Sequence, residues 1–143
     1  MLLDVNILLY WLDVRSPFYP LARRLLHQAT ALGEMVGVPW VTTLGFLRIA
    51  TNRRLAIATL ETSQAVDAAE RLLGQPNVWI PQPGPQHVRL LGELAAKYNL
   101  SGASLTDAHL AALAIEHKLA VVSFDRGFDR FNEIRWFNPA STT

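Results

Sequence analysis

Short segments that are apolar throughout alternate along this chain with stretches of helical periodicity, and this alternation constrains the fold more than any other feature. The strand-like segments are residues 2–3, 35–38, 77–80, 119–124 and 134–137. Helical patterns cover residues 5–12, 18–32, 41–50, 63–73, 88–95 and 105–117. Because only strands buried on both faces tolerate continuous apolar runs, the pattern predicts an α/β sandwich with a mainly parallel central sheet.

The chain has 143 residues, a length that fits one domain and leaves little room for a second. It contains no internal repeat, low-complexity tract or linker-like stretch. Its most irregular segment, Pro81–Pro85, is too short and rigid to separate domains and predicts a loop. We therefore expect a single domain over residues 1–143.

The chain contains no cysteine, which excludes disulfides, thiol nucleophiles and cysteine-based zinc sites. Any metal chemistry must therefore use oxygen or imidazole ligands. Asp4 interrupts the amino-terminal segment where a signal peptide would need apolar residues, and no apolar run approaches 18 residues. We expect a cytoplasmic protein that does not associate with a membrane.

The balance of apolar and charged residues bears on the partners of the chain. Apolar residues make up 50% of the sequence and charged residues 17%, and the mean hydropathy is +0.17. This surplus predicts that some apolar surface is covered by another chain, and we expect a homodimer. The net charge of +1 provides no global attraction to nucleic acid, so any nucleic-acid binding would depend on local clusters of arginine.

Three aspartates are expected to meet at one edge of the sheet. Asp4 ends the first strand, Asp125 follows the strand at 119–124, and Asp107 lies in the first turn of the helix at 105–117. Each also has a local structural interpretation. Asp4 is a suitable helix N-cap, Asp107 ends a capping-box pattern that starts at Ser104, and Asp125 is a good turn former.

Independent caps have no reason to cluster, and clustered carboxylates repel one another. Two carboxylates about 4 Å apart repel by roughly 4 kcal/mol at an effective dielectric constant near 20, so a site that gathers them normally holds a cation. Oxygen ligands without cysteine suit Mg²⁺, or Mn²⁺ as a substitute. Such an ion activates water and neutralises a phosphodiester, which points to metal-assisted cleavage of a nucleic-acid backbone.

Two other classes that use an aspartate at a strand end fit poorly. A phosphoaspartate phosphatase needs a second acid two residues after Asp4, where this chain has Asn6. A response-regulator receiver needs a lysine near the last strands, whereas the only lysines are Lys97 and Lys118.

Four segments in a fixed order carry a resemblance to a known family. They are Leu3-Asp4-Val5-Asn6, Gly45-Phe46-Leu47-Arg48-Ile49-Ala50-Thr51-Asn52, Thr106-Asp107-Ala108-His109-Leu110-Ala111-Ala112-Leu113-Ala114 and Ser123-Phe124-Asp125-Arg126-Gly127-Phe128-Asp129-Arg130-Phe131. Together they resemble the VapC-type PIN-domain ribonuclease toxins of VapBC toxin–antitoxin pairs, and their order and spacing cover nearly the whole chain.

The resemblance implies a three-layer α/β/α sandwich, Mg²⁺-dependent endoribonuclease activity and a VapB-type antitoxin. By position, Asp4 and Asp107 match the metal-ligating acids. Asp125 matches a third catalytic acid that acts directly or through water. Asn6 and Thr106 match polar residues that support the acids or the attacking water, although both could instead be local caps.

At two positions this chain lacks an acidic residue that the resemblance implies. Gly45 stands where the family commonly has Glu, and Gly127 replaces a second acid near the last long strand, with Asp129 as a possible substitute. These departures leave an alternative open, in which the chain is a non-catalytic PIN-like binding or dimerisation module with a degenerate acidic site.

The remaining candidates are basic and aromatic residues. Arg48, Arg126 and Arg130 are the candidates for contacts with RNA phosphates. His109 lies two residues from Asp107, about 200° around a helix, so it should face away and pack. The other histidines (His27, His87 and His117) are expected at the surface or in caps, and the tryptophans (Trp11, Trp40, Trp79 and Trp136) in the core.

Overall fold

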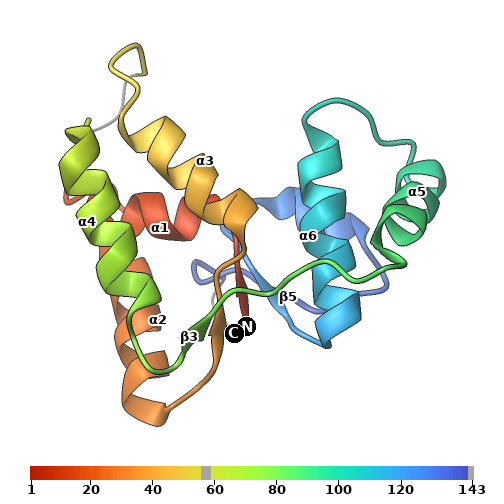
Figure 1. The fold of residues 1–143 in the computed structure, drawn as a ribbon, viewed down its shortest axis with the longest axis horizontal. Helices are drawn as coiled ribbons and strands as arrows, with labels where there is room; N and C mark the ends of the chain where they lie inside the picture. Colours follow the sequence, from red (N-terminus) through yellow and green to blue (C-terminus); the bar gives the residue numbers. More distant parts are fainter. Residues whose placement is uncertain (56–58, 142–143) are drawn as a thin grey trace.

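The computed structural model describes residues 1–55 and 59–141, and within these residues it has five short strands, six α-helices and one 3₁₀ helix (Figure 1). The strands are β1 (Leu2–Leu3), β2 (Val36–Gly37), β3 (Val78–Trp79), β4 (Val121–Val122) and β5 (Trp136–Phe137). The helices are α1 (Val5–Leu12), α2 (Tyr19–Leu32), α3 (Trp40–Ala50), α4 (Thr62–Leu73), α5 (His87–Lys97), α6 (Ser104–His117) and the 3₁₀ helix η1 (Arg126–Arg130).

The five strands form one parallel sheet in the order β3-β2-β1-β4-β5. In the centre, Leu2 pairs with Gly37 on one side and with Val121 on the other. Backbone bonds continue past the assigned strands, for example from Asp4 N to the Val122 oxygen at 3.0 Å. The prediction of a parallel α/β sheet is confirmed, although each assigned strand is shorter than or equal to the apolar run that predicted it.

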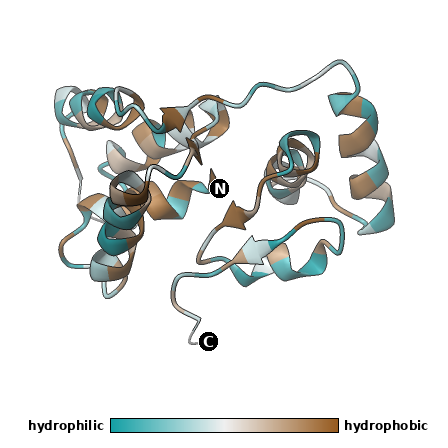
Figure 2. Ribbon diagram, turned by 90° about the horizontal axis from the view of Figure 1, so that it is seen from below, coloured by the Kyte–Doolittle hydropathy of each residue, from teal (hydrophilic) through white to brown (hydrophobic). Residues whose placement is uncertain are grey.

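Helices cover both faces of the sheet, as a three-layer sandwich requires. Leu3 and Val122 contribute to a core with α1, α2, α3 and α4, whereas Leu2 and Val121 contribute to a core with α5 and α6. Neighbouring strand residues thus point into opposite layers, because side chains alternate along a strand. Figure 2 shows apolar strands between the helices. Hydrophobic and hydrophilic residues alternate along each helix.

Two predictions about single residues are wrong. Trp40 is 50% exposed, and the other three tryptophans are only partly buried, although Trp11 and Trp136 pack against the cores. His87 is buried, because its Nδ1 contacts the Glu116 carboxylate and its Nε2 lies 2.8 Å from His109 Nδ1. This chain of contacts joins α5 to α6, and it confirms that His109 turns away from Asp107 and packs.

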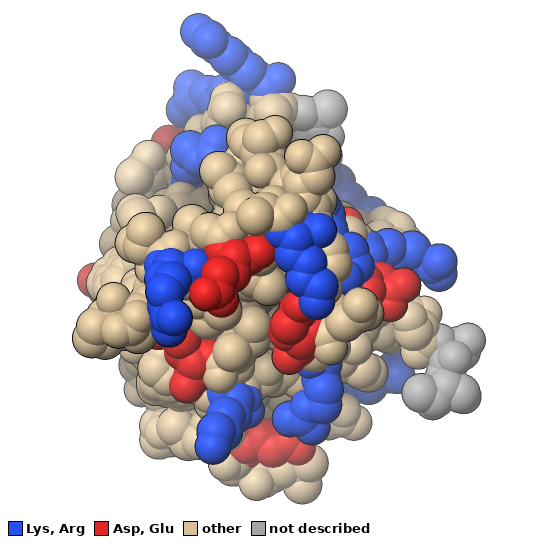
Figure 3. Space-filling model, turned by 90° about the vertical axis from the view of Figure 1, so that its right-hand side faces the viewer, with Lys and Arg blue, Asp and Glu red and all other residues tan. Residues whose placement is uncertain are grey.

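The surface carries both signs of charge and a surplus of apolar groups. On the face shown in Figure 3, acidic and basic side chains are interspersed, in keeping with the net charge of +1. Large apolar side chains are also exposed, among them Leu32, Leu44 and Val88. Among the described residues, no helix combines the length and apolar character needed to cross a membrane.

The topology brings the expected acids to one edge. Because β1 and β4 are parallel neighbours, the residues that follow them, Asp4 and Asp125, emerge at the same carboxyl edge of the sheet. On α3, the Thr42 hydroxyl donates a 2.7 Å hydrogen bond to the Leu3 carbonyl. This bond fixes α3 beside the end of β1 and therefore beside Asp4.

Candidate active site

Asp4 caps a helix and also belongs to the acid cluster. Its Oδ1 accepts a 2.7 Å hydrogen bond from the Val5 backbone as the N-cap of α1. Its Oδ2 accepts bonds from Ser123 Oγ at 2.6 Å and from Asn6 Nδ2 at 3.2 Å. Burial raises the pKa of Asp4, the bonds from Ser123 and Val5 oppose this, and the charge of Asp125 raises it further. The capping interpretation is confirmed, and it does not exclude a place in the cluster.

Asp125 likewise combines a turn with membership of the cluster. Its Oδ1 accepts a 2.8 Å bond from the Gly127 backbone, which starts η1, and its own N–H donates to Ser123 Oγ at 2.9 Å. The turn interpretation is therefore confirmed. The side chain is exposed, and its charge acts on both Asp4 and Asp107.

Asp107 does not cap its helix, so the capping-box interpretation is wrong. Helix α6 begins at Ser104, with Ala103 at the N-cap position and no side-chain cap. The Ser104 hydroxyl instead bonds to the backbone of Ser101, at 2.8 Å to its oxygen and 3.1 Å from its nitrogen. The sequence pattern was one residue out of register with a capping box, because Ser104 is already helical.

The surroundings of Asp107 are electrostatically unfavourable for its charge. Burial raises the pKa of Asp107 to about 6, and the charges of Asp4 and Asp125 contribute to this rise. Arg130 opposes it, with Nη2 lying 3.5 Å from Asp107 Oδ2. The Arg130 Nε donates a 2.6 Å bond to the Gly127 carbonyl, which holds the guanidinium over the cluster.

Ser123 is a site residue that the sequence analysis missed. It is fully buried at the end of β4, where its hydroxyl donates to Asp4 and accepts from Asn6 Nδ2 at 3.0 Å and from the Asp125 backbone. Asn6 completes the link, because its Oδ1 accepts a 3.2 Å bond from the Phe124 backbone. A lone hydroxyl directly after two buried valines was the available signal.

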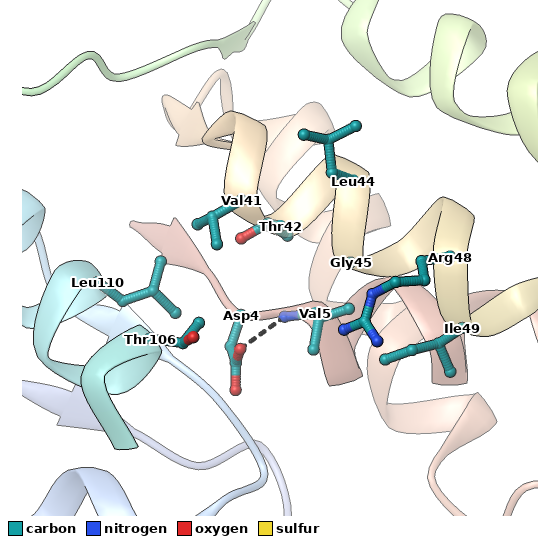
Figure 4. A pocket seen from close by; sticks show the side chains of 10 residues that line it. All are labelled: Asp4, Val5, Val41, Thr42, Leu44, Gly45, Arg48, Ile49, Thr106 and Leu110. Atoms are coloured by element: carbon teal, nitrogen blue, oxygen red, sulfur yellow. Dashed lines mark hydrogen bonds between the residues drawn. The ribbon is translucent and has the colours of Figure 1, made fainter. Parts of the chain in front are cut away.

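A hollow of about 400 Å³ opens beside Asp4 (Figure 4). It is lined by Asp4, Val5, Val41, Thr42, Leu44, Gly45, Arg48, Ile49, Thr106 and Leu110. Figure 4 shows Asp4 between Thr106 of α6 and Arg48 of α3. Thr106 and Arg48 are exposed and face this space, whereas Arg126 lines a different hollow. The three candidate arginines therefore do not form one patch: Arg48 and Arg126 line different hollows, and Arg130 lies beside Asp107.

The comparison with known protein families matches residues 1–134 to the PIN domain. The chain belongs to the PIN-domain family. Two curated relatives of this PIN domain come from Mycobacterium tuberculosis (strain ATCC 25618 / H37Rv). Ribonuclease VapC37 is 33% identical over 138 residues, which is 96% of each chain. Ribonuclease VapC31 is 36% identical over 138 residues, or 96% of this chain and 97% of the relative.

Solved structures share the fold at lower sequence identity. VapBC2 from Rickettsia felis, bound to a DNA fragment from its promoter, matches with a TM-score of 0.71 and 14% identity over 96% of each chain. VapC20 from Mycobacterium tuberculosis, described as a sarcin-ricin loop cleaving toxin, matches with a TM-score of 0.69 and 18% identity, over 94% of this chain and 98% of its own. These likenesses support the PIN fold, including its parallel sheet between two helical layers.

This PIN domain has few carboxylates at the site, as its sequence suggested. Gly45 lies in α3 and lines the hollow beside Asp4 without offering a ligand. Asp129 is exposed in η1, while the acids that act on Asp107 are Asp4 and Asp125. Among residues 1–55 and 59–141, no group of three or more His, Asp or Glu side chains is arranged to hold a metal ion unaided. A cation here would need water among its ligands.

Removing the charge of Asp107 should stabilise the folded PIN domain near neutral pH. The folded-state pKa of about 6 lies above the ordinary aspartate value of 3.8, so between these two pH values the folded protein retains a proton that the unfolded chain has released. The ionised group therefore destabilises the fold above pH 6, and the penalty disappears as pH falls toward 4. We expect Asp107→Asn to add about 1 kcal/mol to the free energy of unfolding at pH 8, after allowance for solvent screening.

Denaturant unfolding in EDTA at pH 8, 6 and 4 measures this effect. The matched control is Asp67→Asn, which removes an exposed acid on α4 and should change stability little at any pH. A gain for Asp107→Asn that is equal at pH 8 and pH 4, or matched by the control, would contradict the electrostatic explanation.

Proposed function

We propose that this PIN domain is a divalent-metal-dependent endoribonuclease that cleaves RNA phosphodiester bonds with an activated water, acting as one catalytic unit over residues 1–143. The observation that carries the proposal is the convergence of Asp4, Asp107 and Asp125 at one sheet edge, where the charge of Asp125 raises the pKa of Asp4 and the charges of Asp4 and Asp125 raise the pKa of Asp107. The relatives named as VapC ribonucleases support the choice of RNA as substrate.

The donor chemistry of the cluster fits Mg²⁺ or Mn²⁺. The acids offer only oxygen, and the local repulsion that raises the pKa of Asp107 is the kind that a bound cation relieves. Asp4 and Asp107 are the proposed ligands, and Asp125 acts directly or through water. When bound, the ion supplies Lewis-acid polarisation of the phosphate and a water of lowered pKa.

The chain's own residues orient this cluster. Ser123 and Asn6 hold the Asp4 carboxylate from the protein side, so its rotation is restricted before any ligand arrives. Thr106 faces the hollow beside Asp4 and is the proposed support for the attacking water. Arg130 neutralises part of the acid charge, and we assign Arg48, Arg126 and Arg130 to contacts with RNA phosphates.

Cleavage should depend on the acid cluster rather than on fold stability. We expect Asp4→Asn and Asp107→Asn each to reduce RNA cleavage by roughly a hundredfold or more, because each removes a ligand charge that the reaction needs. The assay is incubation of the purified chain with total RNA in Mg²⁺, with EDTA as the metal-free arm.

Asp67→Asn should cleave like the wild type. A folded Asp107→Asn protein that cleaves RNA at the wild-type rate would contradict the proposed role of Asp107. Failure of the wild type to cleave RNA in either Mg²⁺ or Mn²⁺ would favour the alternative, a non-catalytic binding or dimerisation module with a degenerate acidic site.

We further propose that a VapB-type antitoxin restrains the enzyme in the cytoplasm and that the chain forms a homodimer. VapBC complexes among the solved structures of similar fold support such a partner. The proposed antitoxin site is the hollow beside Asp4, which Thr106 lines and Asp107 follows in the chain, because this hollow is largely apolar and includes the exposed Leu44. Access of RNA to the acids would then be blocked directly.

An unrestrained ribonuclease should harm the cell that makes it. Induced expression of the chain alone in a bacterial host is expected to arrest growth, and Asp107→Asn at equal protein level should relieve the arrest. Growth curves with immunoblots of both proteins measure this. Unimpaired growth with abundant folded wild-type chain would count against a toxin.

Restoring an acid at position 45 should strengthen metal binding. A Cβ at Gly45 would lie 3.3 Å from Val5 Cγ2, so the Val5 side chain must shift by only a few tenths of an ångström. The position is helical, and its side chain would enter the hollow that contains Asp4. We expect Gly45→Glu to tighten Mn²⁺ binding by about tenfold in calorimetric titration.

The matched control is Gly92→Glu, because Gly92 lies on α5 with open space around its missing Cβ and does not line the hollow. Equal Mn²⁺ affinity of the wild type and a folded Gly45→Glu protein would show that position 45 does not serve the metal.

A further inference from the structure

A second hollow, of about 440 Å³, is lined in part by the two residues that flank Asp125 in the chain. It is lined by Phe18, Phe124, Arg126, Asn138, Ala140 and Ser141, and we call it the Phe18–Phe124 pocket. It shares no lining residue with the hollow beside Asp4. Its volume lies within the range of roughly 300–1,000 Å³ that is usual for ligand pockets.

The wall of the pocket is aromatic and is held from behind. The rings of Phe18 and Phe124 lie 4.7 Å apart, centroid to centroid, at an angle of 33°. Tyr10 packs against both, at 5.1 Å from Phe18 and 5.2 Å from Phe124, but does not line the pocket. The two phenylalanines are only half-buried. A partly exposed, rigidly backed ring is the kind of platform on which an unpaired nucleobase stacks.

The charge of the pocket suits a nucleotide rather than an apolar peptide. Arg126 is exposed at the rim, and none of the six lining residues is acidic. Asn138 is buried and shapes the far wall, because its Oδ1 accepts a 2.9 Å bond from the Ala140 backbone. An aromatic wall, a guanidinium and polar groups without a carboxylate together match a base and its phosphate.

The position of the pocket links it to the reaction. Phe124 and Arg126 are the chain neighbours of Asp125, whose backbone is extended, so their side chains and its carboxylate leave the chain on opposite sides. An RNA strand that crosses the backbone at Asp125 would therefore reach both the acids and the pocket.

We propose that the Phe18–Phe124 pocket receives the base of an unpaired RNA nucleotide that flanks the cleaved phosphate, with Arg126 holding a phosphate of that strand. This inference rests on the proposed ribonuclease function and adds to it a subsite for single-stranded RNA. Base-paired RNA would be excluded, because a base must leave its stack to contact the rings.

The test measures binding in EDTA, where no metal-dependent cleavage occurs, by fluorescence anisotropy of labelled single-stranded RNA oligomers. Phe18→Leu keeps an apolar side chain but removes the ring face, and we expect it to weaken binding about tenfold. Tyr10→Leu is the matched control, because it removes a ring of the same cluster that packs behind the wall but does not line the pocket, and its affinity should fall much less than that of Phe18→Leu. Phe18→Trp should restore binding.

A second readout separates stacking from a merely structural role. In the wild type, an abasic site at one position of the oligomer should cost about tenfold in affinity, and in Phe18→Leu the same abasic site should cost nothing further. Arg126→Gln should weaken binding and flatten its salt dependence, whereas Arg89→Gln on α5 should do neither. If Phe18→Leu does not fold, the abasic scan of the wild type and Arg126→Gln decide the matter.

Equal RNA affinity of Phe18→Leu and Tyr10→Leu, or an abasic scan with no sensitive position, would overturn the subsite, and a protein partner would then be the better occupant. Normal cleavage in Mg²⁺ with those results would overturn the subsite alone. Absence of both cleavage and RNA binding in the wild type would overturn the proposed function with it.

Discussion

The parallel pairing of β1 with β4 is the constraint on which the rest of the site depends. Leu2 pairs with Val121 and Leu3 with Val122, so both strands end at the same edge of the sheet. Asp4 then emerges beside Ser123, close enough for a 2.6 Å hydrogen bond. A shift of one residue in this register would exchange the buried faces of β4 and turn the Ser123 hydroxyl away from Asp4. Core packing and site geometry are therefore specified by the same strand pair.

The site that this register creates is electrostatically costly, and the chain offsets only part of the cost. Hydrogen bonds from Ser123 and the Val5 backbone stabilise the charge of Asp4. Asp107 has a single ion pair with Arg130, and its pKa still rises to about 6. Carboxylates whose charge the fold leaves under-compensated cluster at functional sites, where a charged ligand can complete the site.

The order of elements and the three aspartates could be predicted from the sequence because both depend on local pattern. Apolar runs indicated the strands, and strand ends located Asp4 and Asp125. Ser123 could not be found in this way, because its role depends on Asp4, which is 119 residues away along the chain. His87 was misjudged for the same reason, since its burial depends on contacts with α6 rather than on its own surroundings in the sequence.

For two of the acids, the local and the functional interpretations proved compatible rather than exclusive. The N-cap bond of Asp4 and the turn bond of Asp125 each use Oδ1, and this orients the rest of the carboxylate at the sheet edge. Local structure thus aims these two side chains before any ligand binds. Asp107 receives no such bond from its own helix terminus, because α6 starts without a side-chain cap. In the described part of the chain its one side-chain partner is Arg130, across 3.5 Å, so Asp107 is the least restrained of the three acids.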